Sequence, residues 1–100
     1  MTWLIIFGGS FEKVRELLNM IEETARTGEK VMLLLIHEAC KSATDKNFCE
    51  ETQQRGVDLY VLREGLAEGL LGQVVEGVEV VDYEGWVKLL EECEKVFSWT

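Results

Sequence analysis

The sequence predicts an α/β fold, a small three-layer domain in which a parallel sheet of four to five strands is flanked by helices. Continuous apolar runs at residues 3–7 and 31–36 show no alternation of polar and apolar side chains, which is typical of strands buried on both faces. A third apolar run covers residues 57–62, and amphipathic segments separate the three. Strands that alternate with helices form a parallel sheet with right-handed crossovers.

The first strand is followed by a helix in the expected order of elements. The strand ends at Gly8-Gly9, and Ser10 is expected to begin the helix because its hydroxyl can accept a hydrogen bond from a first-turn amide. Gly28 suits the left-handed position beyond the last turn. The apolar positions at helical spacing are Phe11, Val14, Leu17, Leu18, Ile21 and Ala25.

The middle of the chain is less regular. Residues 37–46 are polar and irregular in pattern, so we expect a loop there with one helical turn. A short helix over 47–55 is expected to stop at Gly56, and another short helix, bounded by glycines, is expected over 63–71, after the third strand.

The C-terminal part predicts a fourth strand at 78–81 and a last helix for which Asp82 is the N-cap. Residues 96–99 are expected either as a fifth, edge strand or as an apolar tail. Only about two helices are long enough to cover the sheet well, so the sequence favours an oligomer or a complex with a protein partner. The apolar face of the last helix is expected to consist of Trp86, Leu89, Leu90 and Cys93.

Length and charge limit the classes of function. One hundred residues leave room for one hydrophobic core, so we expect a single domain over residues 1–100. No apolar run is long enough to cross a bilayer and no signal peptide is recognisable, so we expect a cytoplasmic protein without membrane contact. The net charge of −9 repels phosphate backbones and argues against direct nucleic acid binding, although acidity also serves simple solubility.

One cysteine and the only histidine are candidates for chemistry at the carboxyl edge of the sheet, where ligands of parallel sheets bind. His37 and Cys40 are three residues apart, close enough to meet on one helical turn. An imidazolium would lower the pKa of the thiol, so Cys40 is a candidate reactive thiol and His37 its thiolate partner. The alternative is a loop histidine beside a half-buried cysteine without a joint role.

Other candidate sites are weaker. The segment Gly8-Gly9-Ser10 lacks the spacing of nucleotide-binding loops, so a tight turn and a helix cap are its favoured interpretation. A zinc site that uses Cys49 with the His37 and Cys40 side chains lacks a fourth ligand. No metal or cofactor is therefore expected, and Cys49 and Cys93 are expected to be structural.

The second half of the chain contains three segments in a recognisable order, which are VDLYVLREGLAEGL at 57–70, LGQ at 71–73 and VEVVDYEGWVKLL at 78–90, followed by the closing Trp99. This ordered set resembles the TusB/DsrH family. Residues 29–36 and the following short helix resemble the family's second strand and its D-G-V-x-A loop. The chain departs from this pattern at residues 37–40, where the Asp-Gly-Val of the family is replaced and a cysteine lies nearby.

The resemblance implies a DsrEFH-like fold and a place in a sulfur relay. It implies a complex with TusC/TusD-like or DsrE/DsrF-like subunits that passes persulfide sulfur on for 2-thiolation of the tRNA wobble uridine, or acts in sulfur oxidation. In the TusD/DsrE relatives the working cysteine follows the third strand, where this chain has Leu62-Arg63-Glu64. The resemblance therefore favours a non-catalytic interaction subunit that is not an enzyme on its own. The alternative is a sulfur-transfer protein that carries a persulfide on Cys40.

Overall fold

The computed structural model describes residues 2–9 and 13–99 and confirms the predicted three-layer α/β fold. Its sheet has five strands in the order β4-β3-β2-β1-β5, and every neighbouring pair is parallel. The C-terminal segment is thus an edge strand, paired with the first strand. The strands are β1 (Thr2–Phe7), β2 (Lys30–Leu35), β3 (Asp58–Leu62), β4 (Glu79–Val81) and β5 (Lys95–Trp99).

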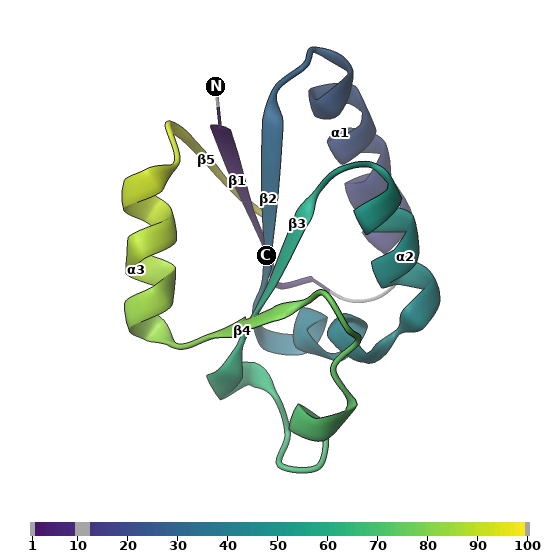
Figure 1. The fold of residues 1–100 in the computed structure, drawn as a ribbon, viewed down its shortest axis with the longest axis vertical. Helices are drawn as coiled ribbons and strands as arrows, with labels where there is room; N and C mark the ends of the chain where they lie inside the picture. The colour runs from purple at the N-terminus through teal and green to yellow at the C-terminus, as the bar shows by residue number, and fades with distance from the viewer. Residues whose placement is uncertain (1, 10–12, 100) are drawn as a thin grey trace.

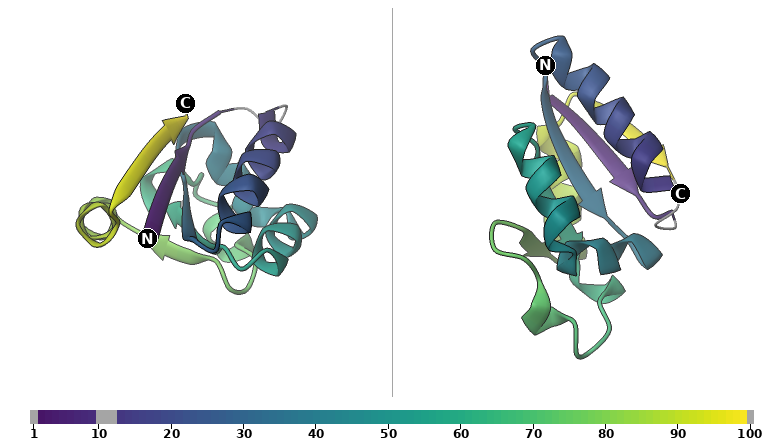
Figure 2. Two further views of the ribbon diagram at one scale, coloured as in Figure 1. Left: turned by 90° about the horizontal axis from the view of Figure 1, so that it is seen from above. Right: turned by 90° about the vertical axis from the view of Figure 1, so that its right-hand side faces the viewer.

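Helices cover the two faces of the sheet unequally. Figures 1 and 2 show α1 (Val14–Arg26) and α2 (Lys46–Gln54) on one face and α3 (Tyr83–Glu92) alone on the other. This arrangement follows from the topology, because the chain steps from β1 to β4 in one direction and then returns across the other face to place β5 beside β1.

Local sequence signals explain where the helices begin and end. Gly28 and Gly56 have φ angles of +82° and +78°, the left-handed conformation that ends α1 and α2. The Asp45 carboxylate accepts a hydrogen bond from the Asn47 amide at 3.0 Å and caps α2. Asp82 caps α3 as predicted, since its carboxylate accepts a hydrogen bond from the Gly85 amide at 2.8 Å.

The centre of the sheet and one side of α1 form the core. All residues from Leu4 to Phe7 and from Val31 to Ile36 are buried, as expected of strands covered on both faces. Helix α1 contributes Leu17 and Ile21, which are fully buried. The predicted helix start at Ser10 lies outside the described residues.

The segment between β3 and β4 differs from the prediction, because no α-helix covers residues 63–71. The chain instead makes short 3₁₀ turns, η3 (Arg63–Gly65) and η4 (Leu71–Gln73). Backbone hydrogen bonds join residues three apart, from the Leu66 amide to the Arg63 carbonyl and from the Leu70 amide to the Ala67 carbonyl. Three glycines within eight residues explain this outcome, since each glycine costs about 1 kcal/mol in a helix interior.

Two further expectations need smaller corrections. Residues 37–46, expected as a loop with one helical turn, form a longer 3₁₀ helix, η2 (His37–Thr44). On α3, Leu89 and Cys93 are buried and Trp86 packs against the core, but Leu90 is 39% exposed. Leu90 lies at the margin of the helix face, where the sheet no longer covers it. Across the described ranges, no helix has the length and apolar character needed to cross a membrane.

Candidate functional site

The carboxyl edge of the sheet brings the predicted site segments together. The β1 and β2 strands end side by side, with the Ile36 amide donating to the Phe7 carbonyl at 2.9 Å. The η2 helix begins directly after β2 at His37, which has a positive φ of 51°. The η2 and η3 turns contact one another above this edge.

The Cys40 thiol lies inside this edge. Its side chain is 0% exposed, and its Sγ lies 3.4 Å from the Leu35 carbonyl and 3.6 Å from the Leu62 carbonyl, to which the S–H group donates. Burial raises the pKa of the Cys40 thiol from 9.0 to about 11. The thiol is therefore protonated near neutral pH, which makes it a poor nucleophile.

The turn after β3 closes over this thiol. A Cβ atom at Gly65 would collide with Cys40 Sγ and would lie 3.3 Å from the backbone nitrogen of His37. Only glycine lets the η3 turn approach so closely. This role of Gly65 was not predicted from the sequence, where the one available signal is a glycine soon after the end of a buried strand.

A reactive thiol at this edge would have to be accessible, but carbonyl groups and the η3 turn surround the Cys40 thiol and bury it. His37 begins the same 3₁₀ helix, but its side chain is exposed. Within the described ranges no hydrogen bond joins the His37 imidazole to the Cys40 thiol. The role of Cys40 as a persulfide carrier, and of His37 as its thiolate partner, stays a prediction.

The two other cysteines are also buried. Burial raises the pKa of the Cys49 thiol to about 11, with a smaller contribution from the Asp45 carboxylate. The Cys93 thiol donates to Met32 Sδ at 3.6 Å, and burial raises its pKa as well. In the part of the chain that the structure describes, no three His, Cys, Asp or Glu side chains gather as metal ligands would.

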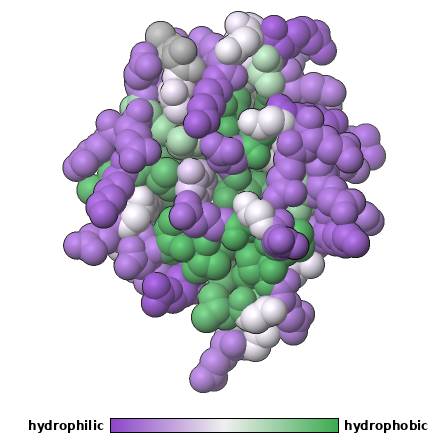
Figure 3. All heavy atoms as spheres, in the orientation of Figure 1, coloured by the Kyte–Doolittle hydropathy of each residue, from purple (hydrophilic) through white to green (hydrophobic). Residues whose placement is uncertain are grey.

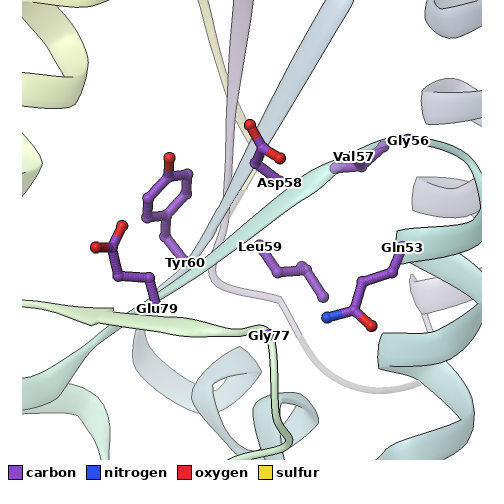
Figure 4. Close-up of a pocket in the computed structure, with 8 residues that line it drawn as sticks. All are labelled: Gln53, Gly56, Val57, Asp58, Leu59, Tyr60, Gly77 and Glu79. Carbon is purple, nitrogen blue, oxygen red and sulfur yellow. The ribbon is translucent and has the colours of Figure 1, made fainter.

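A hollow among the described residues lies at the amino end of β3, away from the thiol. It has a volume of about 470 Å³, and Cys40 contacts the opposite, carboxyl end of the same strand. Figure 4 shows the carboxylates of Asp58 and Glu79 beside Tyr60, whose pKa is raised by burial and by neighbouring carboxylates. The hollow runs along the part of β3 that the short β4 leaves unpaired. Its acidic lining does not suit an anionic substrate.

An apolar surface adjoins the turn that covers Cys40. Figure 3 shows apolar side chains gathered over β4 and the segment that leads to it. Leu71 is 48% exposed, and the segment is held against η2 by a hydrogen bond of 2.9 Å from the Val75 amide to the Ala43 carbonyl. We call this surface the β4 patch; its exposed member is Leu71, and its partly buried members are Leu66, Val74, Val75, Val78 and Val80.

Fold and site together define the class of this protein, a small parallel α/β domain whose carboxyl edge holds a covered cysteine beside an apolar surface. The sequence profile of the family described as DsrH like protein matches residues 10–96. The chain belongs to the DsrH family, as the resemblance predicted. A search of curated proteins gives no match.

Proposed function

We propose that this chain is a non-catalytic subunit of a sulfur-relay complex that supports persulfide transfer for 2-thiolation of the tRNA wobble uridine. Its partners would be TusC/TusD-like or DsrE/DsrF-like subunits. Membership of the DsrH family supports a place in a sulfur relay. The observation that carries the non-catalytic role is the complete burial of Cys40, the cysteine nearest the carboxyl edge.

The sequence after β3 supports the same role. The turn there consists of Arg63, Glu64 and Gly65 and offers no thiol. A sulfur carrier has to present its thiolate to both a donor and an acceptor, whereas Cys40 donates to buried carbonyls beneath this turn. The persulfide would therefore reside on a partner.

The β4 patch supports an interaction role. A cluster of exposed and half-buried apolar side chains at the surface of a small domain is typical of a protein interaction site. This patch continues onto the turn over Cys40, so a partner seated on it would place its own thiol near the carboxyl edge of this sheet. We propose the β4 patch as the contact surface for the partner subunit.

The charge of the chain argues against direct tRNA binding by this subunit, so in the proposed relay another component holds the tRNA. A net charge of −9 gives no counterion release on contact with a phosphate backbone. In a filter-binding assay at physiological salt, the isolated chain should show no measurable tRNA binding. Sub-micromolar binding by the chain alone would contradict this division of labour.

Reconstitution with partner subunits, a cysteine desulfurase and cysteine tests the proposal. The Cys40→Ala variant should support as much sulfur transfer as the unchanged chain. Leu71→Glu should lose partner binding and sulfur transfer together. Leu90→Glu, at an exposed leucine outside the β4 patch, should keep both.

Mass spectrometry of the same reactions separates the two roles of the chain. The proposal expects no added sulfur on this subunit. A gain of one sulfur atom on Cys40, lost in Cys40→Ala together with sulfur transfer, would establish the chain as a persulfide carrier. Normal partner binding by Leu71→Glu would exclude the β4 patch as the contact surface.

A further inference from the structure

Among the described residues no strand pairs with the outer edge of β5, and this edge forms a second surface together with the side of α3 that faces it. We propose that this β5–α3 surface pairs with a second copy of the chain, joining the two sheets across a twofold axis at Phe97. The inference is independent of the sulfur-relay proposal and concerns the opposite edge of the sheet from the β4 patch.

The backbone of β5 carries the first part of the argument. The Gly8 amide donates to the Trp99 carbonyl at 2.9 Å, so the backbone groups of Trp99 face β1. Along a strand these groups point to alternate sides, so those of Phe97 also face β1 and those of Val96 and Ser98 face outward. The outer edge thus presents an amide and a carbonyl on each of two residues.

These outward groups are complementary to themselves. In an antiparallel pair about Phe97, Val96 lies opposite Ser98 of the second copy, and the two residues exchange both backbone hydrogen bonds. The twofold axis repeats this exchange on the other side of Phe97. Phe97 then lies opposite its own copy, in the closely spaced type of antiparallel pair whose side chains contact one another.

The two edges of the sheet differ in their protection against such pairing. Natural edge strands are guarded by shortness, charge, proline or bulges. Strand β4 is only three residues long and carries the exposed Glu79. Strand β5 begins with the exposed Lys95, but its other four residues, 96–99, have no charge and no proline although the chain has a net charge of −9. Val96 and Phe97 are 46% and 42% exposed.

Helix α3 lies on the same face of the sheet as the Val96 side chain. The Cys93 thiol at the end of α3 contacts Met32, and the strand registers place Met32, Leu4 and Val96 in one row across the sheet. In the joined sheet the twofold axis is perpendicular to the strands and to the sheet, so both copies of α3 lie on this face.

The exposed side of α3 faces the β5 edge. The Glu92 carboxylate contributes to the raised pKa of Tyr60, which places that side of the helix over β3. Leu90 lies about 160° around the helix from Glu92, on the side toward β5. Leu90 is 39% exposed and Val87 is 52% exposed. A stable interface needs about 1,000 Å² of buried area in total, more than the pairing of two short strands provides. A second copy that covers these α3 side chains adds apolar area to the interface.

Disulfide trapping tests both the partner and the register. Phe97→Cys places two thiols across the axis at about 4.5 Å between Cα atoms, within the range that a disulfide spans. Lys95→Cys is the matched control, an exposed position on the same strand that lies far from its own copy in this register. Under mild oxidation the Phe97→Cys chain should form a covalent dimer and the Lys95→Cys chain should not, because the native cysteines are buried.

Charge substitution tests the same contact without oxidation. Light scattering over a concentration series should show a dimer for the unchanged chain. Phe97→Lys and Phe97→Glu should each raise the dimer dissociation constant about tenfold, because like charges meet at the axis, and an equimolar mixture of the two should restore the dimer. Circular dichroism of each variant excludes unfolding as the cause.

Three results would overturn the inference. One is a monomeric unchanged chain, and another is a dimer that the two charge variants leave intact. The third is that β5 pairs only with a different subunit. In that case the chain alone forms no dimer, and Phe97→Lys loses the binding of that other subunit. The Leu71→Glu variant should still dimerise, so failure of this inference is distinguishable from failure of the sulfur-relay proposal.

Discussion

Alkaline pH is expected to destabilise the folded chain through its buried thiols. Burial raises the pKa of Cys40 and of Cys49 from 9.0 to about 11. A group whose pKa is raised by folding contributes stability below its unfolded pKa and loses it as the pH rises through the folded pKa. Each thiol should therefore stabilise the fold below pH 9 and lose this contribution as the pH rises to about 11.

The size of the effect follows from these two pKa values. One pKa unit corresponds to about 1.4 kcal/mol, so each thiol contributes about 3 kcal/mol in full. Loss of both contributions removes about 6 kcal/mol, against a total stability of about 5–15 kcal/mol for a typical domain. We expect the free energy of unfolding to fall steeply between pH 9 and pH 11.

Urea unfolding under reducing conditions, from about pH 8 to about pH 11, measures this slope. Cys40→Ala and Cys49→Ala should each remove about 1.4 kcal/mol per pH unit from it, and the double variant should remove both contributions. The comparison uses slopes, so the constant cost of the cavity that each substitution leaves does not affect it. Equal slopes for the unchanged chain and the double variant would refute the reasoning.

Three substitutions test other parts of the structure. In the native chain, maleimide should label Cys40 no faster than Cys93. Gly65→Ala should accelerate the labelling of Cys40, because the new methyl group forces the η3 turn away from the thiol. An unchanged labelling rate would contradict the close approach of Gly65 to Cys40. Asp82→Ala should cost about 1 kcal/mol in urea unfolding through loss of the α3 cap, and no change would show that the cap is unimportant. Trp86→Ala should lower the free energy of unfolding by about 3 kcal/mol, since this side chain packs against the core. A nearly unchanged melting temperature would show that the packing of Trp86 does not stabilise the fold.

The sequence predicts most of the fold because its apolar runs are long and its glycines are well placed. The runs at β1 and β2 allow no other strand assignment, and Asp82 identifies the start of α3. From the sequence, residues 96–99 could be either an edge strand or an apolar tail, because pairing of β5 with β1 depends on contacts between segments distant in the sequence. The segment after β3 was predicted incorrectly because its glycines were interpreted as the boundaries of a short helix, whereas they disfavour one.

The candidate site was only partly predictable. Residue spacing places His37 and Cys40 on one turn, and the structure confirms that they share η2. Spacing does not say which side chain points inward, and here the cysteine is buried and the histidine exposed. The cover over Cys40 comes from Gly65, on a segment that only the tertiary fold brings near.

The burial of the thiol determines what Cys40 can do in a relay. With a pKa of about 11, about one thiol in ten thousand is ionised at neutral pH, a hundredfold less than for an ordinary cysteine. A carrier role therefore requires movement of the η3 turn, which would expose the thiol and lower its pKa at the same time. The apolar side chains exposed beside this turn and along β5 need no such movement to meet a partner. In this conformation the chain can bind partners through its exposed apolar side chains. The rate at which a maleimide labels Cys40 in the Gly65→Ala variant measures how readily displacement of the η3 turn exposes the thiol.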